Sequence, residues 1–274
     1  PFHDTSGKLR LAYHYWNAPY TNYPAYPACE ANDSCTTQGQ RRMAVDYLEV
    51  TSGGVRVTRT PPIRPPVQSL DPACPSGTVP PSGFRDVTAG SAHARAIDCV
   101  AWWELTGGTT AGRYSPTEPV TRGQMATFVA RMLRASDAGL APGEPGQFSD
   151  VPPGAPHQEN IDALASAGVV GGRSDGTYDP GASVTRAQMA TFLVRAYELI
   201  TGSEMSVARD WFPDDERHTA HETAINKAAT AGLSGGRADG SYGPGLSVTR
   251  AQMASFLART LAALVEEGRA DLPA

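Results

Sequence analysis

Apolar residues in the last two-thirds of the chain follow helical spacing in two kinds of segment. The first kind begins near His157 and places small and branched side chains on one stripe, which indicates a buried helix face. Its members are Ile161, Leu164, Ala165 and Val169 in one copy, and Ile225, Ala228, Ala229 and Leu233 in the next. The second kind carries larger side chains, at Met125, Phe128, Val129, Met132 and Leu133. We therefore expect two helices of different character, joined by a loop.

The second kind of segment opens with strong helix-start signals. Thr121 suits the N-cap position, and Gln124, three residues later, can close a capping box. The same pair recurs as Thr185 with Gln188 and as Thr249 with Gln252. These signals predict a well-defined helix start in each copy.

Both segments belong to a unit that repeats every 64 residues without a gap. Phe84, Phe148 and Phe212 each open an F-x-D step, and V-T-R-[GA]-Q-M-A follows in every copy. A fixed period of this length indicates a structural repeat. We expect a mainly α fold of helix-loop-helix repeats around a central three-helix bundle, with a linear superhelix as the alternative. The repeats span 83–146, 147–210 and 211–274.

The loop between the two helices is rich in glycine. Gly168 and Gly232 stand where a helix C-terminal cap belongs, and Glu104 takes that place in the first copy. Asp-Gly pairs at 175–176 and 239–240 predict a tight turn that the first copy lacks, so its loop is expected to be degenerate. These pairs lack the D-x-[DN]-x-[DN]-G array of a calcium loop, which favours a plain turn.

The chain before the repeats divides into two parts. Residues 1–60 contain short runs rich in Val, Leu, Tyr and Trp, which predict a small antiparallel β segment. These runs lie at 8–16, 43–50 and 55–60. Residues 61–82 are rich in proline and predict an extended, stiff linker. The chain begins at Pro1 rather than Met, which indicates a processed or truncated piece of a longer protein.

Composition and cysteine spacing narrow the class of protein. A net charge of −5 over 274 residues, without a basic cluster, argues against a nucleic-acid or anionic-membrane partner. No apolar run is long enough to span a bilayer. The four cysteines lack zinc-site spacing and predict two disulfides in an oxidising compartment, with buried free thiols as the alternative. The expected pairs are Cys29 with Cys35 and Cys74 with Cys99.

One recurring residue does not fit a pattern optimised for helix stability. Arg122, Arg186 and Arg250 occupy the first helical position, where the macrodipole disfavours a cation by roughly 0.3 to 1 kcal/mol. A guanidinium beside unpaired backbone N–H groups suits a carboxylate or phosphate. The alternative is a salt bridge from each Arg to a nearby Asp, such as that of the F-x-D step.

Histidines also recur, and near a helix start we expect capping or solvated residues rather than metal ligands. These are His93, His157 and His221.

F-x-D, the A-I-x-x-L-type helix, G-G-R-x-D-G-x-Y-x-P and V-T-R-A-Q-M-A together resemble the S-layer homology repeat, from about residue 83 to the end. The resemblance implies a three-pronged spindle around a central three-helix bundle. It also implies non-covalent anchoring of an exported protein to secondary polysaccharides of the bacterial cell wall. Typical ligands of that family are anionic sugars with pyruvyl ketals, bound in grooves between repeats.

The resemblance implies ligand binding by the Arg and fourth residue of the family's Thr-Arg-Ala-Glu motif and by the glycine-rich loop. The matching residues are Arg122, Arg186, Arg250, Gln124, Gln188, Gln252, Gly171, Gly172, Gly235 and Gly236. Gln stands where the family usually has Glu, which preserves the capping box but removes a negative charge beside the Arg. Trp102 and Trp103 distinguish the first groove, either by stacking on a sugar or by filling the end of the helix pair.

The first 65 residues are similar to the closing part of five-bladed propeller glycosidases of the arabinanase and xylosidase type. The match rests on D-x-x-G-K-L-x-L-x-Y-H from Asp4, R-R-M-x-V-D from Arg41 and V-x-x-T-P from Val57. In that family the Tyr-His pair places a histidine near the propeller axis, often beside a metal, so His14 is the metal candidate. The family's catalytic carboxylates lie upstream of the match, so we expect no catalytic residue and no cofactor in this chain.

Three hypotheses of function follow. The first is a wall-anchoring module at the bacterial cell surface that binds anionic secondary wall polysaccharide. The second is a C-terminal fragment of a secreted glycoside hydrolase whose catalytic residues are missing from this chain. The third is a structural domain that self-associates. Under the first hypothesis, Arg186→Glu should abolish ligand binding and leave the fold mostly intact.

Overall fold

The computed structural model describes the backbone of residues 2–3, 9–16, 41–51, 54–58, 64–215 and 219–273. Side chains are described for residues 64–215 and 220–273. The chain divides into two compact units, Pro1–Ile63 and Arg64–Ala274.

The first unit contains one antiparallel sheet in which consecutive strands are neighbours. Its strands are β1 (Phe2–His3), β2 (Leu9–Trp16), β3 (Arg41–Thr51) and β4 (Gly54–Thr58). β2 and β3 form the longest ladder, from Arg10 opposite Tyr47 to Trp16 opposite Arg41. The small N-terminal β segment is thus confirmed. Cys29, Cys35 and the side chain of His14 lie outside the described residues.

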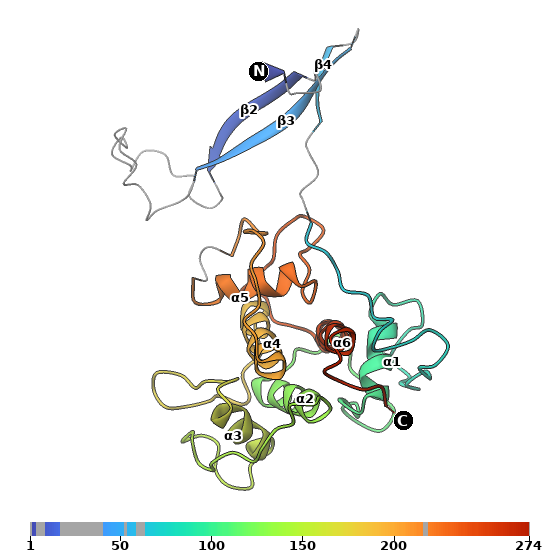
Figure 1. The fold of residues 1–274 in the computed structure, drawn as a ribbon, viewed down its shortest axis with the longest axis vertical. Coiled ribbons are helices and arrows are strands. Elements are labelled where there is room, and N and C mark those ends of the chain that lie inside the picture. The colour runs from blue at the N-terminus through green and yellow to red at the C-terminus, as the bar shows by residue number, and fades with distance from the viewer. Residues whose placement is uncertain are drawn as a thin grey trace. The chain divides into compact units, whose positions relative to one another are not determined.

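The second unit is built from paired helices, and its mainly α character is confirmed. Its elements are α1 (Ala94–Trp102), α2 (Arg122–Arg134), α3 (Gln158–Ser166), α4 (Arg186–Thr201), α5 (Thr219–Thr230) and α6 (Arg250–Glu266). Figure 1 shows α2, α4 and α6 nearly end-on at the centre, with α1, α3 and α5 outside them. Each outer helix packs on the central helix of another repeat: α1 on α6, α3 on α2 and α5 on α4.

A closed ring of backbone hydrogen bonds joins the repeats beside the starts of the central helices. Val120 N–H donates to Val248 O, Val184 N–H to Val120 O, and Val248 N–H to Val184 O, each at 2.9 Å. All three valines have no exposed surface. A linear superhelix would leave its terminal repeats apart, so this ring identifies the closed three-helix bundle.

The predicted helix starts are confirmed. Thr121, Thr185 and Thr249 are the N-caps of α2, α4 and α6, and each forms a complete capping box with the Gln three residues later. These caps fix the register at which each central helix begins, and the large apolar stripe then faces the bundle axis. Met125, Met189 and Met253 are almost fully buried in this core.

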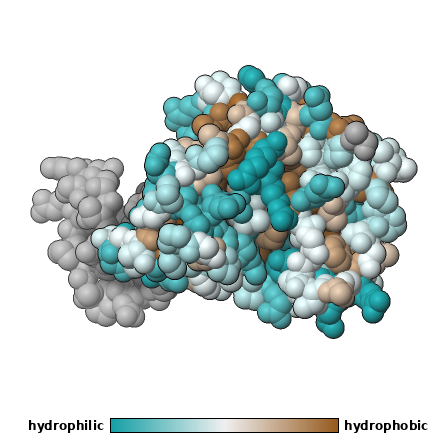
Figure 2. All heavy atoms as spheres, turned by 90° about the horizontal axis from the view of Figure 1, so that it is seen from below, coloured by the Kyte–Doolittle hydropathy of each residue, from teal (hydrophilic) through white to brown (hydrophobic). Residues whose placement is uncertain are grey.

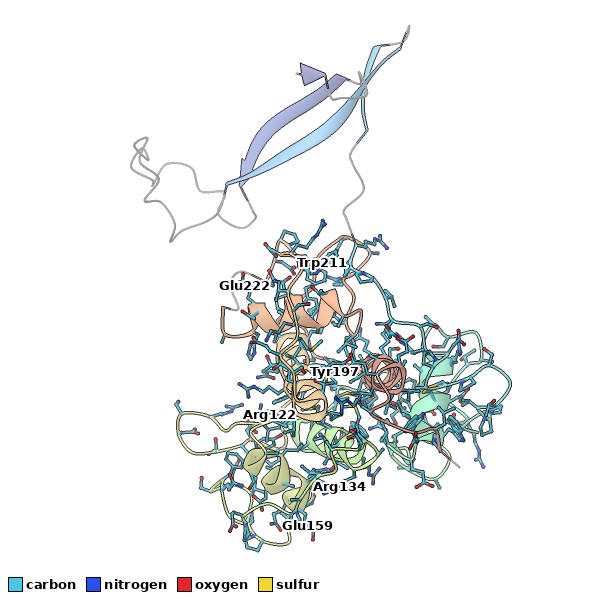
Figure 3. The ribbon with its side chains drawn as sticks, in the orientation of Figure 1. Arg122, Arg134, Glu159, Tyr197, Trp211 and Glu222 are labelled. Carbon is cyan, nitrogen blue, oxygen red and sulfur yellow. A yellow bond between two sulfur atoms is a disulfide. The ribbon has the colours of Figure 1, made fainter. Side chains whose placement is uncertain are left out.

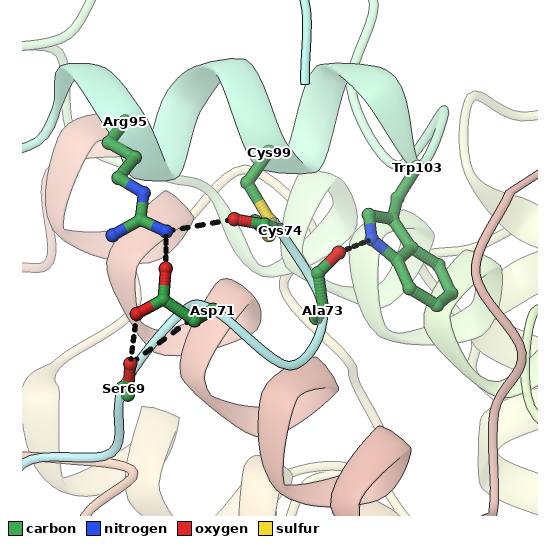
Figure 4. Close-up of a disulfide and its surroundings, with 7 residues drawn as sticks. All are labelled: Ser69, Asp71, Ala73, Cys74, Arg95, Cys99 and Trp103. Atoms are coloured by element: carbon green, nitrogen blue, oxygen red, sulfur yellow. Dashed lines mark hydrogen bonds and ion pairs between the residues drawn. A yellow bond between two sulfur atoms is a disulfide. The ribbon is translucent and has the colours of Figure 1, made fainter. Parts of the chain in front are cut away.

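The proline-rich segment 64–82 packs on the repeats. A disulfide joins Cys74 to Cys99 of α1, with the two Cα atoms 5.6 Å apart (Figure 4). The predicted Cys74–Cys99 pair is therefore confirmed, while residues 64–82 form part of the second unit rather than a free spacer. The interpretation as a linker rested on proline content, which excludes helix but leaves packing open. Within the described residues, no helix combines the length and apolar character needed to cross a membrane.

Candidate binding grooves

Each arginine of the T-R-x-Q step donates hydrogen bonds across the interface between two neighbouring repeats, which we call a seam. Arg122 donates from Nε to the carbonyl oxygen of Tyr178 at 2.7 Å and from Nη2 to that of Gly171 at 3.0 Å. The same arrangement recurs at Arg186 with Tyr242 and Gly235, and at Arg250 with Tyr114 and the hydroxyl of Thr106. Each guanidinium is buried, with 6% or less of the residue exposed. The arginines therefore clamp the Gly-rich loop of the next repeat around the ring.

The tyrosine of each loop returns the contact. The Arg122 guanidinium lies 4.3 Å from the centre of the Tyr178 ring, and the Tyr178 hydroxyl donates to the Arg122 carbonyl at 3.2 Å. Burial raises the pKa of Tyr178 to about 12, which keeps the phenol a donor at any physiological pH. Burial also lowers the pKa of Arg186 and Arg250 from its usual value. In all three seams the arginine and the tyrosine thus each donate to the other's backbone carbonyl.

The backbone N–H groups at the start of each central helix already have acceptors. In α2, Arg122 N–H donates to Ala182 O at 2.8 Å and Gly123 N–H to Pro180 O at 2.9 Å. Gln124 N–H donates to the Thr121 hydroxyl. The expectation of unpaired N–H groups beside the arginine is therefore wrong, because the loop of the next repeat supplies carbonyl oxygens that the sequence pattern does not reveal.

The aspartates of the F-x-D step have a different partner from the arginine. Asp150 accepts from the backbone N–H groups of Tyr178 and Asp179, both at 2.7 Å. Desolvation opposes ionisation of Asp150, but these two hydrogen bonds outweigh it and hold the pKa of the carboxyl below its usual value. Asp86 and Asp214 hold their own loops in the same way. The salt-bridge alternative is thus replaced by carbonyl and aromatic contacts of the arginine.

The other residues predicted to contact a ligand are the glutamines of the T-R-x-Q step and the loop glycines, and they lie in different environments. The side chains of Gln124, Gln188 and Gln252 close the capping boxes through Oε1. A Cβ atom at Gly172 would lie 2.6 Å from the Phe148 ring, and one at Gly236 would lie 2.5 Å from the Phe212 ring, so these glycines permit close packing. Gly171 is exposed and open on its Cβ side.

The recurring histidines also join repeats. His93 Nδ1 lies 2.8 Å from the Ser255 hydroxyl, and His157 Nδ1 lies 2.8 Å from the Thr127 hydroxyl. His221 makes the same contact with Thr191. Burial lowers the pKa of His93 and of His157. The three histidines lie in three separate seams and do not converge on the bundle axis.

A hollow of about 600 Å³ opens between the end of α1 and the end of α2, and we call it groove 1. Its lining is Ala101, Trp103, Glu104, Leu105, Thr106, Gly107, Arg131, Arg134 and Ala135. Arg131 donates to the Leu105 carbonyl at 3.1 Å and is otherwise exposed. Arg122 is the first residue of α2 and Arg134 is the last, and both are labelled in Figure 3. Two arginines and one glutamate give the lining of groove 1 a net positive charge, although the chain as a whole is acidic.

Sequence reasoning missed Arg131. It recurs as Arg195 and Arg259 at the same 64-residue spacing as the other repeat positions, and this periodicity was the available signal. Arg131 and Arg195 are exposed, whereas Arg259 is half-buried. Trp103, in contrast, is 6% exposed and donates from Nε1 to the Ala73 carbonyl at 2.8 Å, so it fills the end of the helix pair.

A second hollow, of about 420 Å³, lies near the ends of α4, α5 and α6. Its charged lining residues are Glu204, Glu267 and Arg269, so its balance is negative. The face seen in Figure 2 is mixed, with polar side chains over most of it and small apolar areas between them. Of these two hollows, groove 1 is the one with a positive lining.

Comparison with known proteins agrees with this geometry. The family model described as "S-layer homology domain" matches residues 83–126, 147–190 and 212–254. Three segments of the chain, one in each repeat, therefore match the S-layer homology domain. An endoglucanase of a Bacillus species is 32% identical over 65% of this chain and 18% of its own length. The S-layer protein sap of Bacillus anthracis is 30% identical over 65% of this chain and 21% of its own length.

An amylopullulanase of Thermoanaerobacterium thermosulfurigenes is 28% identical over 59% of this chain. The chain spans 8% of that relative, and less than a quarter of each of the other two. The S-layer homology domains and these relatives associate the chain with the cell surface or cell wall.

Proposed function

We propose that the second unit is a non-catalytic anchor that holds a longer exported protein on the bacterial cell wall by binding an acidic wall polysaccharide. The observation that supports this most directly is groove 1, an open hollow beside Arg131 and Arg134 at the joint between two helix pairs. Cationic guanidinium groups pair with carboxylates of sugars, including pyruvyl ketals, through charge-assisted hydrogen bonds. Three matching domains in one chain add to this support.

The roles of the predicted contact residues follow from their burial. Arg122, Arg186 and Arg250 hold the loops that border the grooves, and their guanidinium groups act from beneath the surface. The exposed arginines Arg131 and Arg195 supply the charge that an anionic sugar meets. Because the buried arginines hold the loop in place, the loop presents its backbone to the ligand without rearrangement.

The test compares two charge reversals on the complete chain. Arg131→Glu reverses the charge in groove 1, whereas Arg85→Glu reverses an exposed arginine outside its lining. We expect Arg131→Glu to weaken sedimentation with bacterial wall sacculi by at least about tenfold, because a pair worth about 1.5 to 3 kcal/mol becomes repulsive. Arg85→Glu should bind as the unchanged chain does. Equal binding by both variants, with unchanged melting temperatures, would exclude groove 1 as the site.

A second proposal concerns the longer protein. The first unit contains one antiparallel sheet with strands in sequential order, the arrangement of a single propeller blade. We propose that it completes a propeller whose other blades belong to the parent protein, as in the glycosidases it resembles. Joining the chain to its upstream reading frame and assaying arabinan and xylan cleavage tests this. Self-association stays a prediction, which sedimentation velocity would check.

A further inference from the structure

Residues 64–74, which we call the strap, have no counterpart in the other repeats. Positions 64 residues further along the chain lie in α2, or just beyond its end, rather than in an extended segment. Gln68 N–H donates to the Gly232 carbonyl at 3.0 Å, and its side chain donates to Glu266 at 2.7 Å. Arg64 donates to the Ala238 carbonyl at 3.1 Å. The strap thus contacts the loop and second helix of the third repeat.

The other end of the strap is fastened to the first repeat. Cys74 is joined to Cys99, and Arg95 binds both the Asp71 carboxylate and the Cys74 carbonyl (Figure 4). The Trp103 indole donates to the Ala73 carbonyl. Ala73 and Cys74 have 1% or less of their surface exposed. The continuous chain joins the first repeat to the second and the second to the third, but not the third to the first. The strap therefore bridges the seam between the third and first repeats.

The strap lies over the third repeat's counterpart of groove 1. Glu104 and Gly107 of groove 1 correspond to Gly232 and Gly235 at twice the repeat spacing. Gly232 is buried by the strap, whereas Glu104 and the second-repeat equivalent Gly168 are exposed. The equivalent arginines differ in the same way: Arg259 of the third repeat is half-buried, whereas Arg131 and Arg195 are exposed. The threefold symmetry of the surface is broken at the repeat that the strap covers.

We propose that the strap occupies the third groove, which is the third repeat's counterpart of groove 1, and closes it to wall polysaccharide. Closure to polysaccharide rests on the function proposed above, whereas occupancy of the groove by the strap stands without it. The Cys74–Cys99 bond makes the occupancy lasting, because the strap cannot diffuse away while its C-terminal end is tied to α1.

Two glycines make a matched test. Gly232 and Gly168 are equivalent caps with the same φ of 73°, so Ala at either position meets similar backbone strain. A Cβ atom at Gly232 would lie 2.7 Å from Gln68 N, which is strap backbone, whereas a Cβ atom at Gly168 has nothing within 4 Å. Gly232→Ala should therefore expel the strap from the groove, and Gly168→Ala should not.

The first readout is hydrogen exchange of the strap amides in the complete chain. We expect the Gln68 amide to exchange about two- to tenfold faster in Gly232→Ala than in Gly168→Ala, because the variant loses the hydrogen bond that protects this amide. Equal exchange in the two variants would overturn the occupancy.

The second readout is titration with soluble polysaccharide released by acid from bacterial sacculi. Gly232→Ala should bind one more equivalent per chain than Gly168→Ala. An unchanged number of equivalents in a variant whose strap exchanges fast, measured against an unchanged chain that does bind, would overturn the closing of the third groove. Fast exchange with no binding by any of the proteins would contradict the anchoring function and leave the occupancy standing.

Discussion

At the scale of single residues, the arginines of the T-R-x-Q step explain how a cation tolerates the positive end of a helix. Each guanidinium is surrounded by carbonyl oxygens of the next repeat and by the face of a tyrosine ring, for example Arg186 with Tyr242. These partially negative groups offset the macrodipole, which disfavours the charge by only about 0.3 to 1 kcal/mol. The earlier expectation that Arg186→Glu leaves the fold intact is therefore replaced by an expectation of unfolding.

Arg186→Lys should destabilise the protein although it keeps the charge. An ammonium cannot bond Tyr242 and Gly235 through a planar fork, nor stack equally well on the ring, so we expect a loss of about 1.5 to 3 kcal/mol. Urea unfolding measures this. Arg195→Lys is the matched control on the same helix, because Arg195 is exposed, and its effect should stay within about 0.5 kcal/mol. Equal effects would contradict the clamp.

Asp215 should lower stability as the pH rises. Its burial, followed by the charges of Asp210 and Glu222, raises the pKa of the carboxyl from 3.8 to about 7. The folded pKa lies above the unfolded one, so the folded state binds more protons, and stability that is complete below pH 3.8 is lost as pH rises through 7. Its Oδ1 atom has no hydrogen-bond partner among the described residues.

The Asp215→Asn variant should therefore be more stable than the unchanged chain at pH 8, by about 1 to 3 kcal/mol, because it buries no charge. This difference should shrink at pH 5, where the carboxyl is protonated. Urea unfolding at both values checks the sign, and a variant that is less stable at pH 8 would refute the assignment.

At the scale of elements, the sequence reveals local structure well and seam partners poorly. The capping boxes and the apolar stripe depend on residues within one or two turns, so their spacing predicts them. The acceptors of the Arg122 side chain are backbone carbonyls 49 and 56 residues away, and a carbonyl leaves no mark on residue type. For this reason the sequence pattern singled out the arginine but did not reveal its buried setting.

Glu104 marks where the first repeat departs from its siblings. It ends its helix with φ of 56°, a conformation that the other repeats give to Gly168 and Gly232. Glu104→Gly should stabilise the protein by about 1 kcal/mol, because glycine adopts positive φ without the Cβ clash. Thermal unfolding measures it, with Gly168→Glu as the mirrored control that should destabilise. A lower melting temperature for Glu104→Gly would show that its side chain matters more than its backbone.

At the scale of the whole molecule, closure of the ring makes the repeats interdependent. Arg250 of the third repeat clamps Tyr114 of the first, and Val248 completes the ring with Val120 and Val184. A chain truncated after residue 210 therefore loses two seams at once. We expect it to show no cooperative thermal transition by circular dichroism, whereas the complete chain melts with the three repeats as one unit. A stable truncated chain would instead favour the additive stability of a linear array.

The central claim is that the repeats hold the protein on a wall polymer, and one measurement tests it most directly. The complete chain is sedimented with bacterial sacculi before and after chemical removal of their secondary polysaccharide. We predict that it pellets with the intact sacculi and stays in solution with the stripped ones. Binding that survives removal of the polymer, or no binding to either preparation, would contradict the claim.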